Sequence, residues 1–147
     1  MTSSRRLLCG LYGLIALIAL VATWSQNLAY FGGADAGGPL GAFGPFLSDL
    51  RLTPAARSIS LDISLFLYAA AVLMVVEARR LKVRFVWAYI VGGLLIAISV
   101  TFPLFLIARE IALSRGETGG KPGTGDLIGL ALLAVLIAAL CGYILGA

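Results

Sequence analysis

The residue whose type and position most invite a chemical role is Asp62, a carboxylate inside the apolar run Ile59 to Val76. If Glu77 marks the inner membrane surface, Asp62 lies about 22 Å above it at helical rise, beneath the outer boundary of the bilayer core. An ionised carboxylate at that depth costs a few kcal/mol unless it is paired or solvated. We therefore predict an ion pair with Arg109 on the next apolar run, with Arg57 as the competing partner. A proton or ion pathway is the alternative, although no second embedded acid follows to relay a proton.

A second group of charged residues surrounds the short connection after Val76. It comprises Glu77, Arg79, Arg80 and Arg84. This spacing fits a solvated cluster at the membrane surface, which can also bind anionic lipid headgroups. Taken with the predicted pair, the structural polar candidates are Asp62, Glu77, Arg80, Arg109 and Glu110.

No set of residues forms a catalytic constellation. The sequence has no His, which removes the commonest acid–base residue and most zinc-binding patterns. The glycine-rich stretch 116–122 fails the phosphate-loop pattern, because its spacing is one residue short and Pro122 stands where Ser or Thr is required. We predict no catalytic residue, no metal site and no cofactor, and hence a protein that is not an enzyme.

Composition identifies the elements that must position these side chains. The chain has 147 residues, 61% hydrophobic and 12% charged, with a mean hydropathy of +1.03. A soluble domain carries about twice that charge, so the lipid bilayer must be the solvent. Basic residues flank apolar runs instead of forming one face, which indicates membrane topology and not nucleic-acid binding. We predict an all-α integral membrane four-helix bundle, a single transmembrane domain (1–147) with helices near 7–24, 59–76, 85–108 and 127–145.

The basic residues also predict a topology. The tight basic turn after the second helix, together with Arg5 and Arg6, places both termini on the cytoplasmic side of a bacterial inner membrane. The loops at 25–58 and 109–126 then lie outside.

Local signals refine this picture. The glycine-rich stretch 31–45 is not expected to hold a regular helix. The following stretch, 46–57, alternates at near-helical spacing and predicts a short helix lying in the membrane interface. Pro103 is expected to kink the third helix and to free a carbonyl near Ser99.

The fourth apolar run carries a stripe of small residues at i, i+4 spacing, namely Ala134, Ala138, Gly142 and Gly146. Small residues let another helix backbone approach closely, and in lipid such close packing replaces the hydrophobic drive. We predict that this stripe packs against a helix, either within the chain or on a partner.

Several short stretches follow one another along the chain in the order found in a known family. They are Trp24-Ser-Gln-Asn27, Thr53-Pro-Ala-Ala-Arg57 before Asp62, Glu77-Ala-Arg-Arg80 and Phe102-Pro-Leu-Phe-Leu-Ile-Ala-Arg-Glu110. From Leu7 to Leu113 the chain resembles the bacterial membrane family known as domain of unknown function 2834. The glycine-rich expansion after Phe31 and the fourth helix depart from that pattern. The resemblance implies the membrane topology and no particular activity.

We expect a small non-catalytic accessory subunit of a larger membrane complex, such as a respiratory or photosynthetic one. Its partners would be membrane lipids and other membrane-protein subunits, without nucleic acid. The alternative is a carrier or enzyme for a lipid-like molecule such as a quinone or isoprenoid, bound in a cleft lined by Asp62, Tyr68 and Pro103. A third candidate is ion or proton transport, which requires water to reach Asp62 from both sides.

Overall fold

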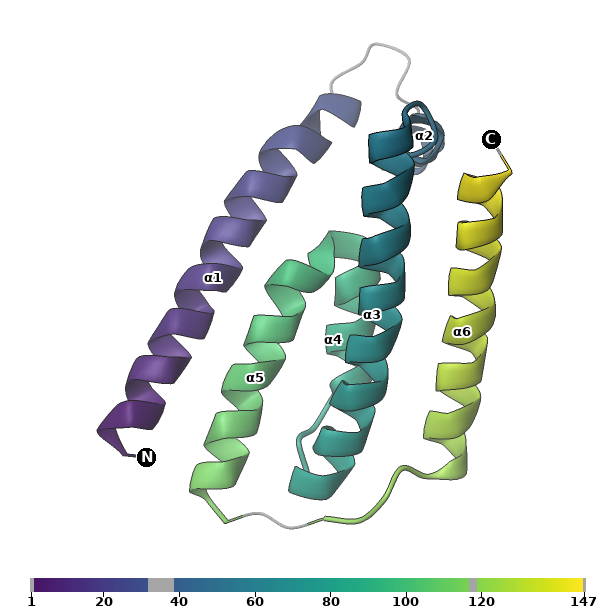
Figure 1. Cartoon of the computed structure of the whole chain (residues 1–147). Coiled ribbons are helices and arrows are strands. Elements are labelled where there is room, and N and C mark those ends of the chain that lie inside the picture. Colours follow the sequence, from purple (N-terminus) through teal and green to yellow (C-terminus); the bar gives the residue numbers. More distant parts are fainter. Residues whose placement is uncertain (1, 32–38, 117–118, 147) are drawn as a thin grey trace.

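The computed structural model describes residues 2–31, 39–116 and 119–146, which form a bundle of helices (Figure 1). We call the end at which α3 ends and α6 begins the lower end, as drawn in Figure 1, and the opposite end the upper end. The described residues contain no strand, which confirms the all-α prediction. In chain order the elements are α1 (Ser3–Asn27), the 3-10 helix η1 (Leu28–Tyr30), α2 (Pro39–Asp49), α3 (Pro54–Leu81), α4 (Val86–Gly92), the π-helix η2 (Gly93–Ala97), α5 (Ile98–Ser114) and α6 (Thr124–Leu145).

Within the described residues, four helical segments are long and apolar enough to cross a membrane, as the sequence predicts. They are Ser3–Tyr30, Pro54–Leu81, Val86–Ser114 and Thr124–Leu145. Each is longer than the predicted helix, because polar residues at the ends continue the helical turns. At the start of α3, for example, the Ala56 N–H donates to Thr53 Oγ1 at 3.0 Å, and a proline occupies the first helical position.

The third apolar segment folds back on itself as a hairpin. α4 and η2 rise from the lower end, the chain turns at Ala97, where the backbone is extended (φ 178°, ψ 140°), and α5 descends beside them (Figure 1). The Tyr89 and Phe105 rings meet edge to face with centroids 5.8 Å apart. A β-carbon at Gly93 would lie 3.2 Å from Thr101 Oγ1. Residues eight positions apart on a straight helix are separated by about 12 Å, so this contact requires a turn.

A glycine pair allows this turn, which the sequence did not predict; the kink expected at Pro103 stays a prediction. β-Carbons at Gly92 and Gly93 would each lie 3.1 Å from a side-chain carbon of α5, so a larger residue at either position would have to displace that side chain. Pro103 lies inside α5. The rising arm, residues 86–97, is about 18 Å long at helical rise. The hairpin tip therefore stops well short of the upper end.

The hairpin changes the topology from the predicted one. After α5 the chain lies beside the end of α3, where the Gly119 N–H donates to the Arg80 carbonyl at 2.7 Å. The loop at 109–126, predicted on the face opposite the basic turn, is thus at the same end as that turn. α1 begins at the lower end and α6 ends at the upper end (Figure 1), which corrects the predicted placement of both termini on one face.

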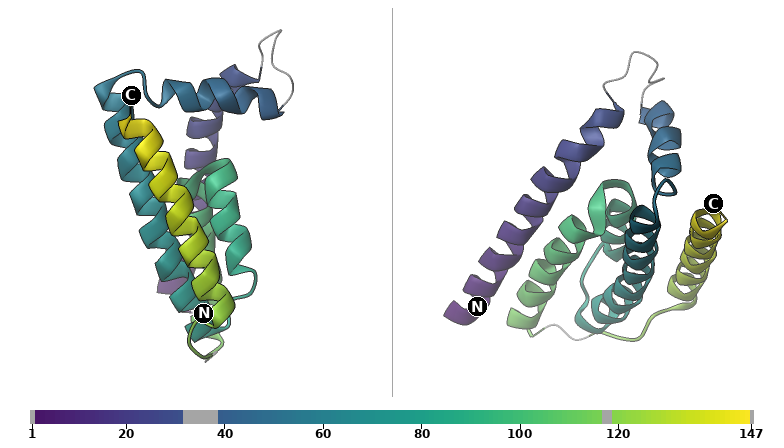
Figure 2. Two further views of the ribbon diagram at one scale, coloured as in Figure 1. Left: turned by 90° about the vertical axis from the view of Figure 1, so that its right-hand side faces the viewer. Right: turned by 45° about the horizontal axis from the view of Figure 1, so that its top comes forward.

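α2 lies across the upper end of the bundle (Figure 2). Tyr30 Oη donates to Asp49 at 2.7 Å, and the Tyr30 ring packs edge to face on Phe46 with centroids 5.6 Å apart. The predicted interfacial helix therefore exists, but it occupies Pro39–Asp49 instead of 46–57. The expectation of no helix in 31–45 is wrong for residues 39–45, because a proline suits the first helical position; residues 32–38 are outside the described part.

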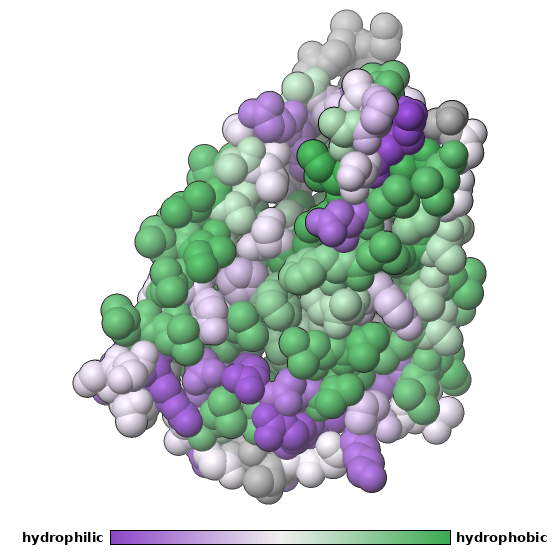
Figure 3. Space-filling view, viewed as in Figure 1, coloured by the Kyte–Doolittle hydropathy of each residue, from purple (hydrophilic) through white to green (hydrophobic). Residues whose placement is uncertain are grey.

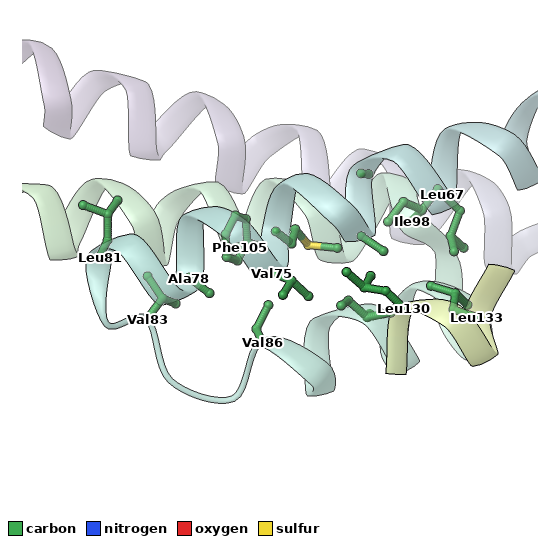
Figure 4. Close-up of a cluster of buried hydrophobic side chains, with 14 of the residues drawn as sticks. Leu67, Val75, Ala78, Leu81, Val83, Val86, Ile98, Phe105, Leu130 and Leu133 are labelled. Atoms are coloured by element: carbon green, nitrogen blue, oxygen red, sulfur yellow. The ribbon is translucent and has the colours of Figure 1, made fainter. Parts of the chain in front are cut away.

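The hydrophobic core surrounds α3, with the hairpin and α6 packed against it (Figure 4). Met74 of α3 and Phe105 of α5 are fully buried there. Trp87 of α4 lies so close to α6 that any side chain at Gly129 would collide with its ring. α1, by contrast, contributes one described buried residue, Ala16. The hairpin and α6 are thus held firmly to α3, while α1 lies at the edge.

Candidate functional site

Charged side chains at the lower end form a connected network. Glu77 accepts hydrogen bonds from Arg80 Nε and Nη2, both at 2.7 Å, and from Arg109 Nε at 2.8 Å. Arg109 Nη1 also donates to Glu110 at 2.9 Å, and Arg5 Nε lies 3.8 Å from the same carboxylate. The network therefore joins α1, α3 and α5. It contains four of the five polar candidates predicted from the sequence.

A second carboxylate, Asp126, connects the start of α6 to α3 and α4. Arg79 donates to it through Nε and Nη2, both at 2.6 Å. Trp87 Nε1 donates at 3.2 Å, and the Gly123 N–H donates at 3.1 Å and so caps the helix. Asp126 is only 5% exposed. Each carboxylate of the two groups already accepts from an arginine, so the arrangement serves to hold helix ends together and leaves no free base.

The predicted ion pair between Asp62 and Arg109 does not form. Asp62 is exposed and makes no ion pair with any described residue. Its place in the third turn of α3 puts it in the upper half of that helix, whereas the hairpin returns Arg109 to the lower end beside Glu77. The prediction failed because it assumed that the third segment crosses the bundle once.

The corrected topology places most of the positive charges at the lower end. Eleven Lys and Arg residues occur in the chain, and two of them, Arg51 and Arg57, belong to the upper end. Figure 3 shows hydrophilic residues gathered at the lower end below a broad apolar surface. The other nine lie at that end: Arg5, Arg6, Arg79, Arg80, Lys82, Arg84, Arg109, Arg115 and Lys121.

The small-residue stripe of α6 does not form the packing face of this helix within the chain. Ala138, Gly142 and Gly146 are exposed, and a β-carbon at Gly142 would meet no other atom within 4 Å. Ala134 is half-buried. The buried face instead carries larger residues, namely Leu130, Leu133, Ile137 and Ile144. Contact of the stripe with a partner stays a prediction.

An apolar cavity of about 610 Å³ lies above the hairpin tip. It exists because α1, α3 and α6 extend beyond the short hairpin, so nothing from the hairpin fills the space between their upper halves. The walls come from α1, α2, α3, the hairpin tip and α6. Asp62, Tyr68 and Pro103, the residues predicted around a cleft, do not line it.

The polar groups of the cavity are uncharged. Its lining contains Thr23, Gln26 and Asn27 of α1 and Ser60, Ser64 and Ser99, and no Asp, Glu, Lys or Arg among the described residues. The Ser99 carbonyl receives no helical hydrogen bond from position 103, because proline has no N–H. Such a site can bind an apolar body with a neutral polar group. The described residues of its lining include no carboxylate, lysine or arginine that could act as an acid or a base.

A smaller cavity of about 130 Å³ adjoins the first beneath α2 and shares Asn27, Phe46, Leu94 and Ile96 with it. Trp24 lines this cavity, and its Nε1 is buried with no hydrogen-bond partner among the described residues. A buried indole N–H normally finds an acceptor. The two cavities together therefore supply an unused donor beside an apolar volume.

A family model described as Protein of unknown function DUF2834 matches residues 11–111, more than half of the chain. The chain belongs to the DUF2834 family. This confirms the resemblance found in the sequence. No curated protein and no solved structure matches the chain. The DUF2834 match extends from α1 into the last turn of α5, so it includes the hairpin and most of the cavity walls; α6 lies beyond it.

Within the DUF2834 region, sequence reasoning missed the hairpin and the partner of Arg79. The available signal was the pair Gly92–Gly93 in the middle of an apolar run. The ion pair of Arg79 with Asp126 joins residues 47 positions apart, and their adjacency depends on the hairpin returning the chain to the lower end. Once the hairpin is missed, the ion pair cannot be found.

Proposed function

We propose that the protein binds an uncharged lipid-like amphiphile, such as a quinone or an isoprenoid alcohol, in the cavity above the hairpin tip. The observation that supports this is the apolar volume of about 610 Å³ with neutral polar groups. Sites for small ligands usually measure about 300–1,000 Å³ and are mostly apolar. An ionised headgroup would find no counter-charge in this lining, so a neutral one is preferred.

The backbone at the hairpin tip supports the same proposal. Non-helical backbone at membrane depth is tolerated where it is buried in protein or lines a cavity. Glycine-interrupted apolar segments mark substrate sites in many transporters for this reason. The extended residue Ala97 and its neighbour Ser99 both line the cavity. A ligand in the cavity could therefore form hydrogen bonds with the backbone polar groups of the turn. Binding of this kind does not require a chemical change in the ligand.

The charge distribution supports an orientation for this site. Cytoplasmic ends of membrane helices carry an excess of Lys and Arg, and nine of the eleven such residues are at the lower end. We place the lower end, where α1 begins, on the cytoplasmic side of a bacterial inner membrane. The cavity then lies in the outer half of the bilayer and takes its ligand from the outer leaflet.

The two tryptophans of the chain allow a direct binding test. Trp24 lines the adjoining cavity and Trp87 lies at the lower end. A short-chain benzoquinone, which quenches indole fluorescence, should saturably quench Trp24 in a Trp87→Phe protein. It should quench Trp87 in a Trp24→Phe protein only weakly and without saturation. Equal unsaturable quenching of both would show a quinone merely dissolved in the micelle and would refute the proposal.

The second candidate is the accessory subunit expected from the sequence. The exposed small residues Ala138 and Gly142 favour it, because they leave a flat strip of α6 open to a partner helix. Replacing Ala138 by Leu should reduce the yield of a co-purifying membrane partner in mild detergent while leaving the stability of the isolated chain unchanged. A protein that purifies alone, with or without that substitution, would contradict this candidate.

A further inference from the structure

A separate cavity lies at the lower end, beside the turn between α3 and α4. A cavity of about 300 Å³ lies there, lined by Ala78, Arg79, Lys82, Val83, Arg84, Gly119 and Gly120. Its outer wall is fixed because the Gly119 N–H donates to the Arg80 carbonyl at 2.7 Å. A side chain at Gly119 would collide with the Arg79 carbonyl, so the wall approaches α3 as closely as glycine permits.

The turn presents its cations in an unusual backbone conformation. Lys82 and Phe85 have φ angles of 54° and 59°, in the left-handed region that residues other than glycine rarely adopt. The Arg84 guanidinium lies 5.4 Å from the centre of the Phe85 ring. Phe85 itself is 75% exposed. The turn therefore brings Lys82 and Arg84 to one cavity and places Arg84 beside an exposed aromatic ring.

Among the described residues, no carboxylate balances the charges of Lys82 and Arg84 in this cavity. Arg79 is committed to Asp126, but neither Lys82 nor Arg84 forms an ion pair with any carboxylate in the described residues. Two uncompensated cations beside a concave wall attract an anion. The position at the helix ends, level with the membrane surface, selects an anion that is presented there.

We propose that this cavity binds the phosphate group of an anionic phospholipid. Lys82 and Arg84 would contact the phosphate oxygens, and Phe85 would lie among the first carbons of the acyl chains, where aromatic residues are favoured. Basic pockets between helices on the cytoplasmic side are suited to such headgroups. This site is separate from the cavity above the hairpin and does not depend on the function proposed for it.

The test is native mass spectrometry of the full-length protein in neutral detergent, titrated with phosphatidylglycerol or phosphatidylcholine. The double variant Lys82→Gln/Arg84→Gln should bind phosphatidylglycerol roughly 30-fold more weakly, since each cation near an anionic surface contributes about a factor of five. The control Arg6→Gln/Lys121→Gln removes the same charge from the same end but not from the cavity walls. It should change the affinity by less than about threefold.

Three results of this titration would overturn the proposal, and a further variant adds a fourth. One is equal loss of affinity in both double variants, and another is equal affinity of the wild type for the two lipids. The third is displacement of phosphatidylglycerol by millimolar inorganic phosphate, which would assign the cavity to a soluble phosphate instead of a lipid. The Gly119→Ala variant keeps every charge but displaces the wall. It should weaken binding, and unchanged binding in this variant would also contradict the site.

Discussion

The ion pair between Arg79 and Asp126 should stabilise the fold by fastening α6 to the rest of the bundle. Asp126→Ala removes the acceptor of Arg79, of the Trp87 indole and of the Gly123 N–H at once. The indole and the Gly123 N–H donate to different oxygens of Asp126. Asp126→Asn keeps only one acceptor oxygen, so it loses the charge and one of these two bonds. The two substitutions should therefore differ, and their difference measures the one hydrogen bond that asparagine keeps.

The magnitudes follow from exposure. A hydrogen bond to a charged group contributes about 1.5–3 kcal/mol when buried, but the Arg79 side chain is 41% exposed, so solvent screening reduces the pair to about 1 kcal/mol. The indole and backbone bonds add about 1 kcal/mol each. We expect Asp126→Asn to lower the free energy of unfolding by about 2 kcal/mol and Asp126→Ala by about 3 kcal/mol.

SDS titration in mixed micelles, followed by circular dichroism, measures these free energies. A double-mutant cycle with Arg79→Gln should give a coupling energy of about 1 kcal/mol. Trp87 fluorescence in the same titration reports whether the indole loses its acceptor. A coupling energy near zero, or equal losses from the Asn and Ala substitutions, would refute this reasoning about how α6 is held.

Three further predictions test the fold. In intact cells, Ser48→Cys should react with an impermeant thiol reagent and Lys121→Cys should not; reaction of both would restore the topology predicted from the sequence. Gly129→Ala should lower the free energy of unfolding by about 1 kcal/mol or more, because its methyl group meets the indole ring of α4. In the control Gly125→Ala the added methyl group meets nothing within 4 Å, so the free energy of unfolding should not change. Equal losses of stability in the two variants would contradict the contact between residue 129 and the indole ring. Asp62→Asn should leave stability unchanged or raise it, since no partner is lost; a clear loss would reveal a hidden pair.

The sequence predicted the membrane class and the four apolar segments, because burial in lipid imposes a composition and a length that can be counted. It could not predict that residues 86–114 form a hairpin. A hydropathy average treats a straight helix and a folded one alike, and the turn depends on how Gly92 and Gly93 meet Thr101 in space. Because the sequence analysis missed the turn at Ala97, it assigned the residues after this turn to the wrong end of the bundle.

The candidate sites could also be predicted only in part from the sequence. Glu77, Arg80, Arg109 and Glu110 could be selected from the sequence because charges beside apolar runs mark helix ends. Their pairing could not, since Arg109 had been assigned to the wrong end. The cavity was also out of reach, because it results from the difference in length between the hairpin and its neighbours and not from any motif.

The cavity above the hairpin tip is tested most directly by the lipids that purify with the protein. Organic extracts of protein isolated in mild detergent can be quantified by mass spectrometry for the wild type and two variants. Ser64→Leu fills the cavity, whereas Ala69→Leu adds the same volume on the exposed side of α3. We predict about one neutral amphiphile per chain in the wild type and in Ala69→Leu, and its loss in Ser64→Leu. The same amphiphile content in both variants would contradict the binding site proposed for this protein.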